Sequence, residues 1–276
     1  MPLLSFTDAG IFCEIGNFYI DPWKKVECAI ITHAHSDHSR WGNAHYIAHN
    51  LSIPIMKLRL GADISVSGRN YGEAFYINGV KISLHPAGHI LGSSQIRVEH
   101  KGEIWVASGD YKTTYDGVCE AFEPVKCHSF ITESTFGLPI FNWKSQNQVF
   151  NDINKWWLNN SENDVCTVLA GYSLGKAQRI LQNLDTSIGK IYVHGAIANI
   201  QEAYHNIGVD FNETLVVNAA VPKENYRKAM ILMPPSAMDS PWMKKFEPYS
   251  LGIASGWMTM RGARSCLLYT SDAADE

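Results

Sequence analysis

Three histidines and an aspartate fall within six positions of segment 31–42, ITHAHSDHSRWG. His33 and His35 are two residues apart, so in extended backbone both imidazoles point the same way and can bind one cation. Asp37 and His38 follow in the turn and face a second cation position next to the first. Imidazole with carboxylate suits zinc, and also manganese or iron. Because this pattern directly follows an apolar, strand-like run, we interpret it as a metal site rather than as chance clustering.

Two further ligands are expected elsewhere. His89, in PAGHILGSS, and Asp110, in ASGDYK, each stand in a glycine-containing turn after an apolar run. A carboxylate can bridge two metals, and Asp110 is the natural candidate. Two metals about 3.5–4 Å apart can share a hydroxide and clamp a phosphoryl group. Other histidines lack such turns, and we interpret them as surface or core residues: His45, His49, His85, His100 and His128.

The elements that must position these residues are short apolar runs ending in polar turns. Such runs predict buried strands that open the segments 28–35, 80–89, 103–110, 129–135, 166–176 and 190–196. Polar residues at the end of a buried strand lie at the rim of a sheet, where enzymes often place their chemistry. Helical spacing appears at 145–160, which opens with a Ser145/Gln148 capping box, and at 174–184. Mixed strands and helices favour an α/β (α+β) architecture.

Composition excludes several classes of protein. The 276 residues, 46% hydrophobic and 18% charged, can form one large or two small globular domains. A net charge of -4 argues against holding nucleic acid by bulk charge, although a local basic groove is compatible with it. We expect no signal peptide and no membrane span. The six cysteines are scattered without a C-x-x-C pair, which indicates free thiols and a cytoplasmic protein.

Several segments carry a family resemblance. THAHSDH, PAGHILGS, SGDYK and TESTFGLP resemble successive motifs of the metallo-β-lactamase fold in its β-CASP nuclease branch, and GYSLGKAQRIL resembles the start of a helix in the inserted domain of those proteins. FYIDPWK, FITESTFGLPIF, MPPSAM and ASGWM resemble bacterial DNA-ligase-associated exonucleases, relatives of mRNA 3′-end processing factors. The resemblance covers about residues 3–264. It implies a four-layer αββα sandwich, with 1–140 in the metallo-β-lactamase core and 141–264 in a reduced, incomplete β-CASP-like region.

The resemblance also implies a dinuclear centre of two zinc ions, with manganese as an alternative. One ion would be held by His33, His35 and His89, and the other by Asp37 and His38, with Asp110 as the bridge. Asp21 matches an aspartate that supports the metal loop from outside the ligand set. Glu133 matches an acid that helps to handle the proton of the leaving group.

The chain departs from the family pattern at its C-terminal end. The family has a histidine after the SGWM segment that completes the second metal site, and this chain does not reach it. Residues 265–276 resemble a translated sequencing adaptor, so we expect a truncated chain with a non-native tail. His194 and His205 are weak candidates to substitute. His194 is expected to line a cleft or pack locally.

The expected reaction is hydrolysis of a phosphodiester by a zinc-activated hydroxide. Asp37 and Asp110 would orient the nucleophile, and Glu133 would serve the leaving group. Candidate phosphate-binding residues lie in small-residue turns or follow a ligand directly, and they are Ser93, Ser94, Lys112, Ser173 and Lys176.

The leading hypothesis is a DNA exonuclease of DNA repair, with a DNA ligase and a helicase as partners implied by the resemblance. An RNA-processing nuclease, a thioester or lactone hydrolase, and an inactive nucleic-acid-binding fragment are the alternatives. The TESTFG segment and the long region after it argue against the small-molecule hydrolase.

Overall fold

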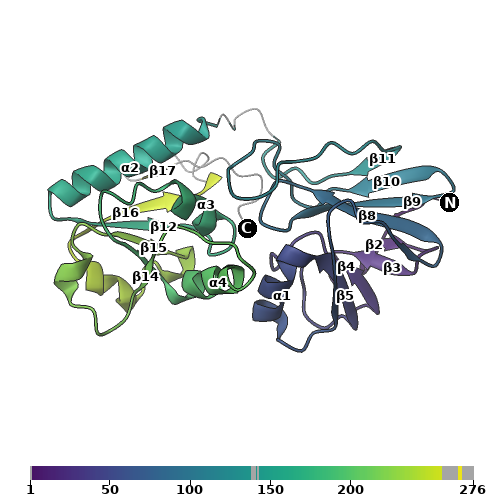
Figure 1. Cartoon of the computed structure of the whole chain (residues 1–276), viewed down its shortest axis with the longest axis horizontal. Helices are drawn as coiled ribbons and strands as arrows, with labels where there is room; N and C mark the ends of the chain where they lie inside the picture. The colour runs from purple at the N-terminus through teal and green to yellow at the C-terminus, as the bar shows by residue number, and fades with distance from the viewer. Residues whose placement is uncertain (1, 138–140, 142, 257–266, 269–276) are drawn as a thin grey trace. The chain divides into compact units, whose positions relative to one another are not determined.

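The structure is a computed structural model that describes residues 2–137, 141, 143–256 and 267–268. It divides into two compact units, Met1–Thr135 and Phe136–Glu276. Both units combine strands with helices (Figure 1), which confirms the mixed α/β architecture. Within the described residues, no helix has the length and apolar composition required to cross a membrane.

The first unit contains two sheets. The strand order is β1-β2-β3-β4-β5-β6 in one sheet and β11-β10-β9-β8-β7 in the other. The first sheet consists of β1 (Ser5–Thr7), β2 (Gly10–Cys13), β3 (Phe18–Ile20), β4 (Cys28–Ile30), β5 (His45–His49) and β6 (Val66–Arg69). The second consists of β7 (Phe75–Ile77), β8 (Val80–Pro86), β9 (Ser94–His100), β10 (Glu103–Ala107) and β11 (Ser129–Ile131).

One hydrophobic core joins the two sheets. Phe18 and Ile30 from the first sheet are completely buried in the same cluster as Ile82 and Val98 from the second. A short 3-10 helix η1 (Asn50–Ser52) and helix α1 (Ile53–Leu60) connect the parallel strands β5 and β6. Burial of apolar side chains from two sheets against each other fixes the strand ends that carry the polar turns.

Strand direction brings the predicted site residues to shared sheet edges. β8 and β10 both pair antiparallel with β9, and β11 pairs parallel with β10, so these three strands end at the same edge. His89, Asp110 and Glu133 follow those ends. In the first sheet β3 and β4 are parallel, so Asp21 and the loop that begins at Ile31 also leave from one edge.

The second unit is a parallel sheet in the order β14-β13-β15-β12-β16-β17. Alternate residues of β12 enter two different cores, Leu169 in one and Val168 in the other, so both sheet faces are covered. The helices α2, α3 and α4 all contribute to the first of these cores. The strands are β12 (Cys166–Ala170), β13 (Ile191–Val193), β14 (Leu215–Val216), β15 (Met230–Met233), β16 (Tyr249–Ala254) and β17 (Leu267–Leu268). The helices are α2 (Gln146–Glu162), α3 (Lys176–Asn183), α4 (Gly195–His205), η2 (Lys223–Tyr226), η3 (Pro235–Ala237) and η4 (Pro241–Phe246).

The predicted helices and strands are confirmed. Ser145 caps α2, and its hydroxyl and the Gln148 side chain form the predicted capping box. The tail predicted at 265–276 lies outside the described residues, except that Leu267–Leu268 pairs with β16 as strand β17. The predicted position of the missing histidine, after the SGWM segment, also lies outside them. The family resemblance implies a domain boundary between residues 140 and 141, whereas the two compact units divide between 135 and 136. The family boundary stays a prediction.

Candidate metal and catalytic site

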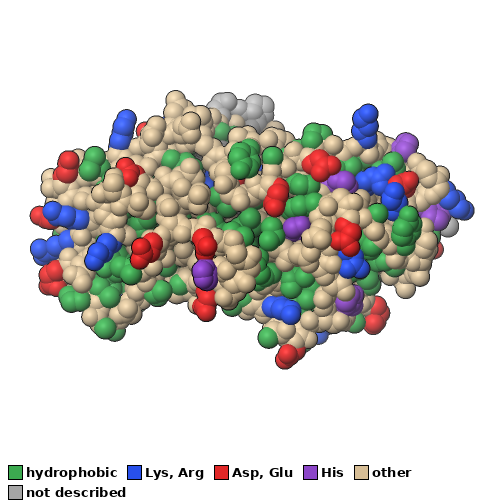
Figure 2. Space-filling model, viewed as in Figure 1, with side chains coloured by type: hydrophobic (Ala, Val, Ile, Leu, Met, Phe, Trp, Pro, Cys, Tyr) green, Lys and Arg blue, Asp and Glu red, His purple; other side chains and the backbone are tan. Residues whose placement is uncertain are grey.

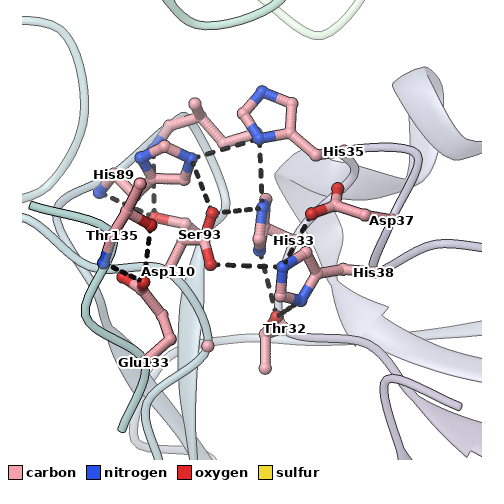
Figure 3. Close-up of polar contacts among 12 residues, drawn as sticks. Thr32, His33, His35, Asp37, His38, His89, Ser93, Asp110, Glu133 and Thr135 are labelled. Carbon is pink, nitrogen blue, oxygen red and sulfur yellow. Dashed lines mark hydrogen bonds and ion pairs between the residues drawn. The ribbon is translucent and has the colours of Figure 1, made fainter. Parts of the chain in front are cut away.

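The six predicted ligands converge in the first unit (Figure 3). One group contains ligand atoms of His33, His35, His89 and Asp110, all within 4.8 Å of one another. A second group, with the same spacing, contains Asp37, His38 and Asp110. Three separate loops supply these side chains, so the tertiary fold assembles the site from the ends of different strands.

The first group has the dimensions of a tetrahedral metal site. His35 Nδ1 lies 3.1 Å from His33 Nε2 and 3.1 Å from His89 Nε2. Asp110 Oδ2 lies 3.7 Å from His33 Nε2 and 3.8 Å from His89 Nε2. Zinc bonded at about 2.0–2.1 Å in tetrahedral geometry separates its ligands by roughly 3.3 Å. Three imidazole nitrogens and one carboxylate oxygen at these distances therefore fit a divalent ion of the zinc type.

The second group shares Asp110 with the first. His38 Nε2 lies 3.2 Å from Asp110 Oδ1 and 3.3 Å from Asp37 Oδ2. Each oxygen of Asp110 thus faces a different group, which is the arrangement required of a bridging carboxylate. Among the described residues this group offers three ligands, one fewer than a tetrahedral ion takes.

Asp21 and Thr32 hold the ring of His38. Asp21 Oδ2 lies 2.8 Å from His38 Nδ1 and accepts a 2.5 Å hydrogen bond from the Thr32 hydroxyl. Asp21 Oδ1 accepts from the Thr32 backbone N–H at 2.8 Å. A proton on Nδ1 would leave the lone pair of Nε2 to bind a cation held together with Asp37 and Asp110. A carboxylate behind a ligating histidine is a common way to set the tautomer and orientation of the ring.

Burial and charge shift the pKa values of the cluster in different directions. Complete burial, together with the neighbouring His38, His35 and His89, holds the pKa of His33 well below its ordinary value. Burial also opposes charge on His38, but Asp21 and Asp110 outweigh it and raise the pKa of that ring. Asp110 is buried as well, and the hydrogen bond and charge of His38 nevertheless lower its pKa. The cluster therefore combines a neutral imidazole with an ionised carboxylate, both suited to binding a cation.

Glu133 lies beside the second group. Its Oε2 accepts hydrogen bonds from the Thr135 backbone N–H at 2.8 Å and from the Thr135 hydroxyl at 2.7 Å. Burial and the charge of Asp110 raise the pKa of Glu133. A cavity of about 240 Å³ is lined by Glu133, Asp37 and His38 together with apolar side chains. A carboxyl group with a raised pKa beside a ligand cluster is placed to exchange a proton with a bound molecule.

The structure gives three predicted phosphate-binding residues local roles in the first unit. Ser93 is buried, and its hydroxyl accepts from the backbone N–H groups of His89 and Ile90 at 3.0 and 3.2 Å. Ser94 is buried and donates to Gly92 O at 3.1 Å. Lys112 is buried, with its ammonium 3.3 Å from Asp116 Oδ2. These contacts shape the turn around His89 and the loop after Asp110, and the role of the three residues in phosphate binding stays a prediction.

The remaining two phosphate-binding candidates belong to the second unit. Ser173 and Lys176 lie at the start of α3, where the Ser173 carbonyl accepts from Gln178 Nε2 at 3.0 Å. Gly175 precedes the helix with a φ of 83°, a left-handed conformation that favours glycine. Lys176 is buried. Their role in substrate binding stays a prediction.

Thr32, Thr135 and Arg59 contribute to the site without having been assigned such a role from the sequence. Arg59, from α1, donates through Nη1 to the carbonyl of Ala34, between the first two histidine ligands. The threonines carry no distinctive spacing signal, although each stands next to, or two residues from, a predicted site residue.

Three of the histidines interpreted as surface or core residues have local partners. His85 lies 2.9 Å from Glu123 Oε1, and His128 Nδ1 accepts from the Ile104 N–H at 3.0 Å. His49 caps η1 and stacks on Tyr71. His194, in the second unit, caps α4 by accepting from the Ala196 N–H at 3.1 Å. This cap supports the expectation of a local packing role for His194.

Comparison with known proteins identifies nucleic-acid enzymes. No family model matches the chain. A probable DNA ligase from Opitutus terrae is 26% identical over 268 residues, which cover 96% of this chain and 26% of that protein. RNase aCSPSF2 from Saccharolobus solfataricus is 30% identical over 117 residues, which cover 41% of this chain and 23% of that protein. The chain therefore spans about a quarter of the length of these two relatives.

A solved structure supports the fold alone. The crystal structure of a protein of unknown function from Enterococcus faecalis V583 matches with a TM-score of 0.56 at 12% sequence identity. The match covers 88% of this chain and 69% of that one.

Proposed function

We propose a function from the premise that the chain belongs to the β-CASP metallo-β-lactamase family, as its curated relatives do. The proposed activity is metal-dependent hydrolysis of phosphodiester bonds in nucleic acid. The observation that carries the proposal is Asp110, whose two carboxylate oxygens face two separate groups of ligands. Two adjacent cations can stabilise both the attacking and the leaving oxygen when a phosphoryl group is displaced in line.

The proposed fold follows from the same premise. Two sheets around a common core support the central layers of a four-layer αββα sandwich, with α1 in one outer layer. The parallel, helix-covered sheet of the second unit supports a β-CASP-like region.

The first group of ligands would hold one zinc or manganese ion, and Asp37, His38 and Asp110 would hold the other. A bound divalent metal would supply Lewis acidity toward the phosphoryl oxygens and would make water acidic enough to serve as a nucleophile at neutral pH. Asp37 is half-buried and lines the cavity, where it would orient the nucleophile together with Asp110. Glu133, whose pKa is raised by burial and by the charge of Asp110, would serve the departing oxygen as a proton donor.

DNA is the proposed substrate, in the repair or processing of strand ends. The match to a protein named a DNA ligase, over 96% of this chain, supports DNA and supports a ligase as a functional partner. The match to a protein named an RNase supports RNA as the second candidate, over a shorter part of the chain. The described cysteines are free thiols, which suits the proposed cytoplasmic location.

A substrate panel tests the proposal. The purified chain, supplied with Zn²⁺ or Mn²⁺, should shorten labelled single-stranded or double-stranded DNA faster than it shortens RNA or hydrolyses thioesters and lactones. Asp37→Asn should abolish this activity, whereas Asp63→Asn, which changes an exposed acid in another loop, should not. Hydrolysis of a thioester or lactone without cleavage of any nucleic acid would refute the proposal.

A further inference from the structure

Exposed aromatic and basic side chains cluster on the two loops that carry Asp21 and His38. Trp23, Lys24 and Lys25 follow β3, while Arg40 and Trp41 follow the histidine motif. Trp41 is 66% exposed and Trp23 is 46% exposed. Tryptophan is usually largely buried, so two exposed indoles on adjoining loops require an explanation. These five residues are called the aromatic–basic strip below.

Direct contacts hold the two loops of the strip together. The Val26 N–H donates to Asn43 Oδ1 at 3.0 Å, and the Ala44 N–H donates to the Val26 carbonyl at 2.9 Å. The ammonium of Lys25 lies 4.6 Å from the centre of the Trp41 ring, within the range of a cation–π contact. The strip is therefore one preformed surface rather than two independent loops.

The strip adjoins the candidate catalytic cavity at two points. Arg40 Nε donates to the Asp37 carbonyl at 3.0 Å, so its guanidinium lies against the backbone of a candidate ligand. Trp23 lines the same cavity as His38 and Glu133. A molecule lying along the strip would accordingly reach the side chains proposed to hydrolyse it.

Charge on the strip differs from charge on the chain as a whole. The chain carries a net charge of -4, and acidic and basic side chains are interspersed on the face shown in Figure 2. Lys24, Lys25 and Arg40 belong to these two loops, and two exposed acids lie nearby: Glu27, and Asp8, whose carbonyl accepts from Trp23 Nε1 at 2.8 Å. None of the three cations forms an ion pair with a carboxylate in the part of the chain that the structure describes. Their charge is thus available to an anionic partner.

We propose that the aromatic–basic strip binds the single-stranded end of a DNA substrate and leads it to the cavity. Aromatic faces stack on unpaired bases without strong sequence preference, and adjacent cations follow the phosphates. In this arrangement Trp41 and Trp23 contact bases, and Lys24, Lys25 and Arg40 contact the backbone. Stacking explains why the indoles are exposed, and it favours a single strand over a duplex, whose bases are already stacked. The inference rests on the proposed function for its substrate class but concerns binding alone.

Binding measured without turnover tests the strip. Fluorescence anisotropy of a labelled oligothymidylate with chelator-treated protein reports affinity when no cleavage occurs. Trp41→Ala should weaken binding about tenfold, as expected for the loss of one stacking contact. Lys25→Gln should lower the slope of log affinity against log salt by about 0.7, the contribution of one phosphate contact to a single strand. Matched changes on other exposed surfaces of the same unit, Tyr76→Ala and Lys101→Gln, should leave both quantities unchanged.

The outcomes separate the strip from the proposed chemistry. Wild-type affinity in Trp41→Ala, with native circular dichroism, would overturn the assignment of the strip. Tighter binding of an oligouridylate of equal length, or of duplex DNA, would overturn the assignment of single-stranded DNA. Hydrolysis of a small phosphodiester by the metal-loaded wild-type protein is measured separately. If the metal-loaded protein hydrolyses no phosphodiester, the proposed function is refuted. The anisotropy result would still decide the role of the strip.

Discussion

Replacement of Asp21 by asparagine tests how much the Asp21 carboxylate contributes to metal binding by the second group of ligands. Asp21 Oδ2 faces both His38 Nδ1, at 2.8 Å, and the Thr32 hydroxyl, at 2.5 Å. An amide can still accept from the Thr32 N–H through its oxygen, but its NH₂ then faces His38 Nδ1. That ring must accept at Nδ1 and carry its proton on Nε2, the nitrogen directed toward Asp37 and Asp110. The lone pair needed for a metal is lost.

The expected magnitude follows from the contact removed. Loss of a carboxylate behind a ligating histidine typically lowers metal affinity about 10–100-fold. At about 1.4 kcal/mol for each factor of ten, this corresponds to about 1.4–2.7 kcal/mol. Asp21 contacts His38 directly, whereas it reaches His33 of the first group through the Thr32 hydroxyl, which lies 3.0 Å from His33 Nδ1. The first group should therefore keep more of its affinity than the second.

Competition with a chromophoric chelator measures the two affinities. Asp21→Asn should weaken one class of Zn²⁺ site and leave the other close to wild type. Asp116→Asn is the matched control, since it also neutralises a buried carboxylate but outside both ligand groups. The control should keep both metal affinities while losing about 3–5 kcal/mol of folding stability, because it removes the carboxylate charge that lies 3.3 Å from the buried Lys112 ammonium. Equal metal affinities in Asp21→Asn and wild type would refute the role given to Asp21.

Three further predictions concern catalysis, pH and helix capping. Glu133→Gln should lower the turnover of DNA by at least about 100-fold, as expected for loss of a proton donor, and unchanged turnover in single-turnover assays would exclude that role. Burial lowers the pKa of His49 to about 4 from 6.5, so the unfolded chain takes up its proton first and the free energy of unfolding should fall as pH drops from about 6.5 toward about 4. In urea titrations His49→Asn should show a weaker fall in that window, and an identical pH dependence would contradict the assignment. Ser145→Ala removes the cap that accepts from the Gln148 N–H at 3.4 Å and should cost about 1 kcal/mol by denaturant titration, whereas no loss would show that the capping box does not stabilise α2.

The sequence predicts the ligand groups well because their signal is local. His33, His35, Asp37 and His38 are close in the chain, so their convergence needs only one turn after β4. His89 and Asp110 are distant in sequence, but glycine turns after apolar runs marked them as strand-end residues. The antiparallel pairing of β8, β9 and β10 then brings both to one edge.

Orientation and burial of polar side chains could not be predicted in this way. Ser93 and Lys112 lie a few residues after ligands, which predicts contact with substrate. The structure adds local partners that this pattern does not specify, namely backbone N–H groups for Ser93 and Asp116 for Lys112. A hydroxyl or ammonium next to a ligand satisfies the same sequence pattern whether it faces solvent or the interior. The role of Arg59 depends on where α1 packs, which its own sequence does not specify.

The central claim is that the histidine–aspartate cluster binds divalent metal, and the metal content of the natively purified chain tests it most directly. Elemental analysis should find zinc or manganese bound to the wild-type protein, and a His33→Ala/His35→Ala double variant that remains folded should have lost the ion of the first group. A folded wild-type protein that contains no divalent metal and takes up none on titration would contradict the account.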